Sequence, residues 1–100
     1  MANTAFEMNG STLTVKPHGE LDSKTSPAFE KEVRQHLPGF NSVIIDLEDV
    51  EYISSAGLRA FLSLEKIQED RGAGMKLIHV NEYIMEIFDM VGFTDIVTVE

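Results

Sequence analysis

The sequence contains no cysteine. This absence excludes disulfide bonds, thiolate metal sites and cysteine nucleophiles together, and it is typical of a cytosolic protein. No apolar run approaches the roughly 20 residues that are needed to span a bilayer. The N-terminal segment Met1–Thr4 has neither the positive charge nor the apolar stretch of a secretory signal. We therefore expect a cytoplasmic protein without membrane insertion.

Basic residues are also scarce. The chain has 8 lysines and arginines against 17 acidic residues, and its formal net charge is −9. No basic stripe is available to neutralise phosphates, which argues against nucleic acid and against an anionic membrane surface. The 100 residues, 43% of them apolar, suffice for one core, so we expect a single domain over 1–100 whose partner is a protein.

The first two predicted strands form a hairpin. Asn9-Gly10 separates residues 5–8 from residues 11–15, and this dipeptide favours a type I′ turn, in which both central residues have positive φ. In the second segment, Leu13 and Val15 alternate with polar residues, which indicates one buried and one exposed face. An antiparallel pair is therefore expected to open the fold.

The remainder of the chain alternates between predicted helices and strands. Ser26 and Pro27 fit the N-cap and first position of a helix, with Asp22 or Thr25 as caps for a slightly earlier start. The resulting order ββαβαβαβ predicts a mixed, largely parallel sheet with right-handed crossovers. After the hairpin, the expected elements are a helix ending at Pro38-Gly39, a strand over 43–47, a helix from about Leu58 to Glu69, a strand over 75–80, a helix capped by Asn81 and a strand over 96–99.

Ser54 and Ser55 are placed by this pattern at the start of the second helix. The first N–H groups of a helix have no partner within it, and the positive end of the helix dipole lies there. A phosphate at this position would meet donors that already point toward it. Helix capping explains a serine equally well, needs only one hydroxyl and contributes about 1 kcal/mol. The residues alone favour capping.

Metal and cofactor chemistry find little support in the sequence. His18, His36 and His79 lack a second ligand at a spacing such as i, i+4, so we expect no metal site among them. The glycines at 72 and 74 follow a helix, whereas a nucleotide-binding loop precedes one, so no cofactor is expected.

The acidic run is open to two interpretations. Its members could bind a cation, but they alternate with Leu47, Val50 and Tyr52, which favours the solvated side of a half-buried segment. The run consists of Asp46, Glu48, Asp49 and Glu51.

Catalysis by a serine is an outside alternative. Ser54 and Ser55 lie between a strand and a helix, as a hydrolase nucleophile does, but the Gly-x-Ser-x-Gly pattern is missing because Ile53 stands where its leading glycine would be. We therefore expect no enzymatic activity.

Three blocks of residues together resemble the STAS domain family, in particular the bacterial anti-sigma factor antagonists. The blocks occur in the family's order and the resemblance covers nearly the whole chain. They are Gly19-Glu20-Leu21-Asp22, then Asp46-Leu47-Glu48-Asp49-Val50 with Tyr52-Ile53-Ser54-Ser55-Ala56-Gly57-Leu58, and finally Ile87-Phe88-Asp89-Met90-Val91-Gly92. The resemblance implies an α/β STAS fold with helices mainly on one face of the sheet.

The resemblance also implies a binding protein that is switched by phosphorylation. In the family, an anti-sigma factor that is also a serine kinase, with an ATP-binding fold like that of histidine kinases, binds the unphosphorylated antagonist and releases a sigma factor. The kinase phosphorylates the antagonist at the start of the second helix, and a metal-dependent serine phosphatase removes the phosphate. The family pattern there is commonly Asp-Ser-Ser/Thr-Gly with the first Ser as acceptor. Alignment on Gly57 makes Ser55 the acceptor.

The chain departs from the family pattern in three respects. Ser54 stands where the family often has Asp, which makes Ser54 a second possible acceptor, and Ala56 replaces the following hydroxyl residue. The sequence given ends at Glu100, where many relatives continue into a further helix, so part of the usual sheet cover is expected to be missing or supplied by a partner. The resemblance fits a STAS module of a secretion, stress-scaffold or transporter assembly as the alternative function.

The topology brings the loop before the first helix and the start of the second helix to the same end of the sheet. We therefore expect one partner-facing patch there. Its members are Glu20, Asp22, Ser54, Ser55, Ala56, Gly57, Leu58 and Arg59.

Overall fold

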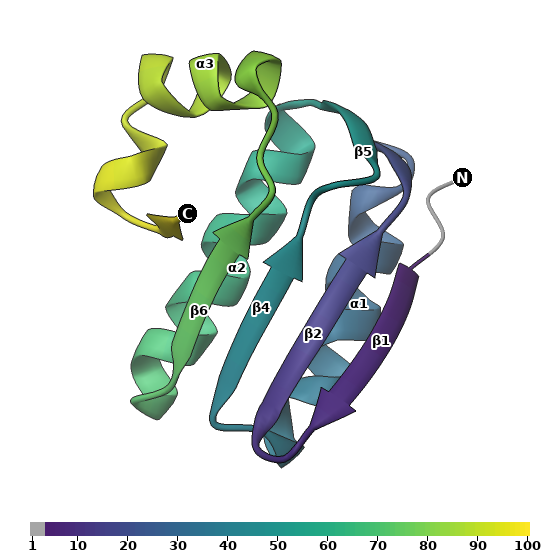
Figure 1. Ribbon diagram of the computed structural model, residues 1–100, viewed down its shortest axis with the longest axis vertical. Coiled ribbons are helices and arrows are strands. Elements are labelled where there is room, and N and C mark those ends of the chain that lie inside the picture. Colours follow the sequence, from purple (N-terminus) through teal and green to yellow (C-terminus); the bar gives the residue numbers. More distant parts are fainter. Residues whose placement is uncertain (1–3) are drawn as a thin grey trace.

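The computed structural model describes residues 4–100. A five-stranded sheet runs through the molecule in the order β1-β2-β4-β6-β7, with β1 antiparallel to β2 and the other neighbours parallel (Figure 1). This arrangement is the mixed, largely parallel sheet that the sequence predicts. Its strands are β1 (Thr4–Asn9), β2 (Thr12–Pro17), β4 (Ser42–Asp46), β6 (Gly74–Ile78) and β7 (Thr98–Val99).

The predicted hairpin is confirmed, but its turn differs from the prediction. Asn9 pairs with Thr12, so the two loop residues are Gly10 and Ser11 rather than Asn9 and Gly10. Gly10 has a φ of +62°, and within 4–100 the only non-glycine residue with positive φ is His79. A two-residue turn with positive φ at its first position alone is of type II′, which places glycine there.

Two helices cover one face of the sheet. Helices α1 (Ser26–His36) and α2 (Ser55–Arg71) lie side by side behind the strands in Figure 1, and their aromatic side chains Phe29 and Phe61 meet edge to face at 5.9 Å. The sheet residues Val15, Ile45 and Leu77 are fully buried against them. Burial of alternate strand residues against the helices is the main source of stability in such a layer.

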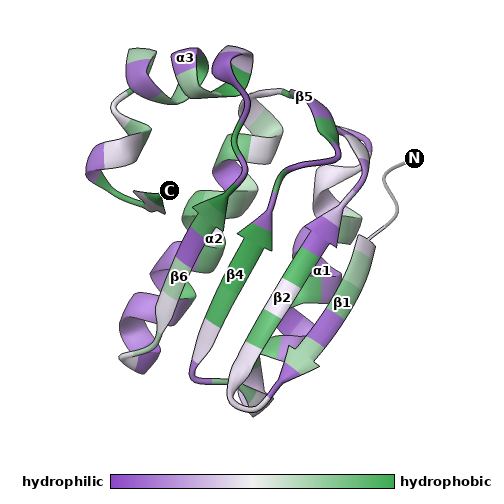
Figure 2. Cartoon of the chain, in the orientation of Figure 1, coloured by the Kyte–Doolittle hydropathy of each residue, from purple (hydrophilic) through white to green (hydrophobic). Residues whose placement is uncertain are grey.

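The third helix lies at the end of the sheet. Helix α3 (Glu82–Met90) follows β6 and lies above the carboxyl end of that strand (Figure 1). Asn81 caps it as predicted, because the Asn81 side chain accepts a hydrogen bond from the N–H of Ile84. Its buried face consists of Ile84 and Phe88. Figure 2 shows these apolar stretches alternating with polar ones along each helix.

The predicted order ββαβαβαβ lacks two short strands that the structure contains. Strands β3 (Gly19–Leu21) and β5 (Val50–Ile53) pair in parallel and form a separate two-stranded sheet. Segments of three and four residues are too short for a readable hydrophobic period, and their pairing, such as that of Glu20 with Tyr52, is not local in the sequence.

Several predicted boundaries also shift. Helix α1 begins at Ser26 with Thr25 at the N-cap, so Ser26 is a helical residue and not the cap. Short 3₁₀ turns follow α1 and α3, namely η1 (Leu37–Gly39) and η2 (Phe93–Asp95). The turn η2 shortens the last strand to Thr98–Val99 and leaves Ile96 exposed. Among the helices of the described chain, none is both long enough and apolar enough to cross a membrane.

Candidate partner-binding site

The start of α2 is fixed by Ser54. Its backbone is extended, and its Oγ accepts a hydrogen bond from the N–H of Ala56 at 3.2 Å, so Ser54 is the N-cap of the helix. The N–H of Ser54 in turn donates to the carbonyl of Leu21 at 2.9 Å. These two bonds join the end of β3 to the first turn of α2. The capping interpretation of the serine pair therefore applies to Ser54.

Ser55 has a different environment from Ser54. It is the first residue of α2 and is exposed. Within the described part of the chain, its hydroxyl makes no hydrogen bond. A side chain with these properties at a helix start can be modified without removing the cap that Ser54 supplies.

Asp22 lies in the loop between β3 and α1. Its Oδ1 accepts hydrogen bonds from the backbone N–H groups of Lys24 at 2.9 Å and Thr25 at 3.0 Å. These donors, the Thr25 N–H above all, favour the ionised form and lower the pKa of Asp22 below its usual value. The Asp22 carboxylate therefore stabilises the loop in which it lies. Glu20, on β3, is the acidic side chain of the predicted patch that is exposed to solvent.

The remaining predicted residues, Ala56 to Arg59, form the first turns of α2. Ala56 and Leu58 are half-buried, and Arg59 is exposed. Gly57 is buried, and a Cβ added to it would lie 2.8 Å from the carbonyl oxygen of Leu21. Gly57 therefore allows the helix to approach β3 closely, while its neighbours on the helix offer atoms to the surface. The structure thus gathers the predicted residues at one end of the molecule.

Tyr52 is a surface residue of this region that the sequence pattern placed on the buried side. It is 40% exposed on β5 and stands opposite Glu20 of β3 in the strand register. Only Val50 and Ile53 of β5 are buried, because the β3–β5 register is irregular and breaks the alternation. Without knowledge of the β3–β5 pair, nothing in the sequence indicates that this ring is exposed.

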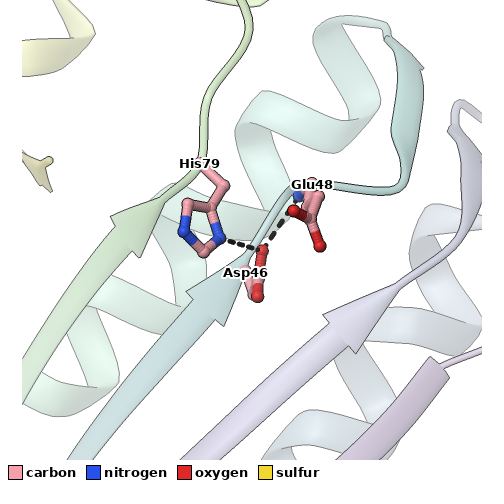
Figure 3. A group of neighbouring side chains, drawn as sticks. All are labelled: Asp46, Glu48 and His79. Carbon is pink, nitrogen blue, oxygen red and sulfur yellow. Dashed lines mark hydrogen bonds and ion pairs between the residues drawn. The ribbon is translucent and has the colours of Figure 1, made fainter.

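A second polar group lies at the carboxyl ends of β4 and β6. Figure 3 shows Asp46, Glu48 and His79, whose candidate ligand atoms lie within 4.8 Å of one another. The sequence spacing could not indicate this group, because His79 meets Asp46 only through the pairing of β4 with β6. Asp46 is also buried, contrary to the predicted solvated run. Carboxylate and imidazole groups at these distances have the donor types of a divalent metal site.

The two carboxylates of this group already have partners within the protein. Burial opposes ionisation of Asp46, but hydrogen bonds from the N–H of Glu48 and from His79 Nδ1, at 2.9 Å, outweigh it and lower the pKa of Asp46. The ammonium of Lys16 lies 3.0 Å from Glu48 Oε1 and 3.6 Å from Asp49 Oδ2. A metal ion would have to displace both Lys16 and the His79–Asp46 bond, and we assign none.

The surroundings of the two serines differ, within the described residues, from those of a hydrolase nucleophile. Within residues 4–100, neither Ser54 nor Ser55 forms a hydrogen bond with a histidine, and the Nδ1 of His79 is bound to Asp46. A nucleophilic serine requires a base within hydrogen-bond reach. The observed arrangement is instead a surface with an exposed serine, an exposed acid and an exposed arginine at the end of an α/β layer.

This fold is a small α/β layer in which a serine is exposed at a helix start. The STAS domain family matches residues 3–100, and the chain belongs to that family. It is 27% identical over 97 residues to the anti-sigma-B factor antagonist of Bacillus subtilis, which covers 97% of this chain and 89% of that protein.

Two solved structures have the same fold. The crystal structure of an anti-sigma factor antagonist from Mycobacterium paratuberculosis has a TM-score of 0.90 at 20% identity and covers 99% of this chain and 85% of its own. The structure of the Bacillus cell fate determinant SpoIIAA in its phosphorylated form has a TM-score of 0.76 at 16% identity and covers 98% of this chain and 91% of its own.

Proposed function

We propose that this protein is an anti-sigma factor antagonist that is controlled by phosphorylation of Ser55. In its unphosphorylated form it binds an anti-sigma factor that is also a serine kinase, and a sigma factor is thereby released. The name of the Bacillus subtilis relative supports the antagonist role. We place this activity in the cytoplasm, in a protein that binds rather than catalyses.

The observation that carries the proposal is the difference in hydrogen bonding and exposure between the two serines. Ser54 caps α2, whereas the hydroxyl of Ser55 is exposed and makes no hydrogen bond within 4–100. The kinase would transfer the γ-phosphoryl group of ATP to Ser55 Oγ, with loss of the hydroxyl proton and release of ADP. A serine phosphatase would hydrolyse the ester to restore the hydroxyl and release inorganic phosphate.

Electrostatics explain why the domain tolerates the modification and the complex does not. Phosphorylation adds a charge of about −1.5 to −2 at pH 7. At a helix N-terminus this charge is favourable to the domain by about 0.3–1 kcal/mol. A partner that packs over Ser55 and Leu58 would bury the same charge beside Glu20, at a cost of several kcal/mol. The fold is retained while the partner dissociates.

The first test is phosphorylation by candidate kinases from the same source. Wild type, Ser55→Ala and Ser54→Ala are incubated with ATP and each kinase, and intact mass and peptide mass spectra are recorded. We expect phosphate on wild type and on Ser54→Ala and none on Ser55→Ala. A kinase that binds the domain but phosphorylates none of the three would refute the switch. If wild type and Ser55→Ala were phosphorylated and Ser54→Ala were not, the acceptor would be Ser54.

The alternative function, a STAS module of a secretion, stress-scaffold or transporter assembly, requires a different readout. A preformed complex of anti-sigma factor and sigma factor is mixed with the protein, and free sigma factor is measured by size-exclusion chromatography. Release by the unphosphorylated protein and not by the phosphorylated one supports the antagonist. Phosphorylation of Ser55 without any release of sigma factor would favour the other assemblies.

A further inference from the structure

Arg59 differs from most other cationic side chains of the protein. Within residues 4–100 it takes part in no ion pair and no side-chain hydrogen bond, although it is exposed in the second turn of α2. By contrast, Lys16, Arg34, Lys66 and Lys76 each pair with a carboxylate. In this acidic protein with 8 basic residues, Arg59 thus has no ion-pair partner among the described residues and lies four positions from the exposed serine.

The helix brings Arg59 toward Ser55. The two residues are four positions apart on α2, so they share one face, with about 5–6 Å between their Cβ atoms. Side chains of a helix lean toward its N-terminus, and the Arg59 side chain is long enough to reach back to the turn that begins at Ser55. An anion on the earlier residue and a cation four positions later is also the favourable order for the helix dipole.

The neighbouring surface contains a second donor without an acceptor. Arg59 and Ala56 line a hollow of about 310 Å³ between the first turns of α1 and α2, together with Ser26. The Oγ of Ser26 is buried and has no hydrogen-bond partner among residues 4–100, and Ser26 is only 2% exposed. Buried hydroxyls are normally hydrogen-bonded, so an orphaned one at this place indicates a missing acceptor.

The carboxylate in the same hollow does not supply that acceptor. Glu30 lines the hollow, but its Oε2 accepts hydrogen bonds from Arg34 at 3.1 Å and from Ser63 at 3.0 Å. Those two bonds occupy this carboxylate oxygen with donors other than Arg59 and Ser26. Within residues 4–100, Arg59 and the Ser26 hydroxyl therefore border the hollow without an ion pair or a hydrogen bond to its carboxylate.

We propose that Arg59 binds the phosphate of phosphorylated Ser55 and forms an ion pair within α2. A guanidinium donates two parallel hydrogen bonds to a phosphate, which makes this pair stronger than one with lysine. The proposal deepens the proposed function and rests on it for the occurrence of phosphoserine at 55. Phosphorylation would then act twice, because it adds negative charge and also withdraws the arginine from the surface that a partner contacts.

The pair is tested without any kinase. Phosphoserine is placed at position 55 of the full chain by genetic encoding, and the ³¹P chemical shift is followed against pH in wild type, Arg59→Gln and Lys66→Gln. Lys66 lies on the same helix, pairs with Asp70 and is two turns further on, so its removal is a matched change of charge. The other charged groups near this turn, Glu20, Asp22, Lys24 and Glu30, are the same in all three proteins.

We expect the second pKa of the phosphate to be lower in wild type than in Arg59→Gln by about 0.5, because a bound guanidinium favours the dianion. Lys66→Gln should match wild type. Equal values in wild type and Arg59→Gln would overturn the pair. Equal increases in Arg59→Gln and Lys66→Gln would also overturn it, since they would reflect net charge rather than contact.

The outcome is independent of the proposed function. A kinase that fails to phosphorylate Ser55 leaves the titration of the encoded phosphoserine unaffected. Conversely, a titration without an Arg59 effect leaves the kinase assay and the release of sigma factor unaffected. A second readout is thermal unfolding, in which phosphorylation should raise the midpoint more in wild type than in Arg59→Gln. Equal increases in the two proteins would contradict the pair as well.

Discussion

Gly57 of α2 lies directly against the carbonyl of Leu21 at the end of β3. A Cβ built on Gly57 would come within 2.8 Å of that oxygen and 2.6 Å of Ile53 Cγ1. The same carbonyl accepts the hydrogen bond of the Ser54 N–H at 2.9 Å. The absence of a side chain at 57 therefore lets the first turn of α2, and with it Ser55, dock against β3.

Gly57→Ala should destabilise the protein. Alanine normally gains up to about 1 kcal/mol over glycine in a helix, but here its methyl group meets backbone at less than van der Waals distance. We expect a net loss of about 1–2 kcal/mol in the free energy of unfolding, measured by urea denaturation. Gly39→Ala is the control, because no described residue has an atom within 4 Å of a Cβ built at position 39. An equally small effect in both variants would disprove the close approach.

Substitutions of the two serines should change the free energy of unfolding by different amounts. Ser54→Ala removes the cap of α2 and should cost about 1 kcal/mol, whereas Ser55→Ala should change stability by less than about 0.5 kcal/mol. Asn81→Ala, which removes the equivalent cap of α3, should resemble Ser54→Ala. Thermal and urea unfolding of the three variants measure this. A larger loss at Ser55 than at Ser54 would contradict the assignment of the cap.

Asp22 should give the stability a pH dependence. Its pKa in the folded protein lies below the usual 3.8, so its contribution is present above that value and is lost as the pH falls through the lower folded value. Asp22→Asn keeps an oxygen acceptor for the loop but does not titrate. We expect wild type to exceed Asp22→Asn in stability at pH 6, with the difference shrinking below about pH 4. A difference that is constant with pH would contradict the lowered pKa.

Partner binding should depend on Glu20. Reversal of its charge in Glu20→Lys changes the proposed surface without disturbing the loop bonds that Asp22 makes. We expect the affinity for the anti-sigma factor, measured by calorimetry, to change at least about tenfold, as the loss or gain of a close charge pair can produce. Glu7→Lys, exposed on the edge strand β1, is the matched control and should bind like wild type. Identical binding by both variants would exclude Glu20 from the interface.

Local chemistry was sufficient for much of the fold. The alternation of Leu13 and Val15 and the cap at Asn81 each act within a few residues of sequence, and each predicted its element correctly. The end of α2 was equally local, because Gly72 takes the left-handed conformation that ends a helix. The predicted position of the hairpin turn was wrong by one residue, because the strand pairing, and not the Asn9-Gly10 dipeptide, decides which residues are central.

The sequence by itself determined the types of the longer elements, the largely parallel sheet and the presence of a serine at a helix start, since periodicity, caps and breakers are short-range properties of the chain. Only the tertiary structure decided which serine caps and which is exposed, because that depends on the bond from Ser54 to Leu21. Tertiary pairing also created the β3–β5 ribbon, exposed Tyr52 and joined His79 to Asp46. These contacts link residues about 30 positions apart, and no local preference can encode them.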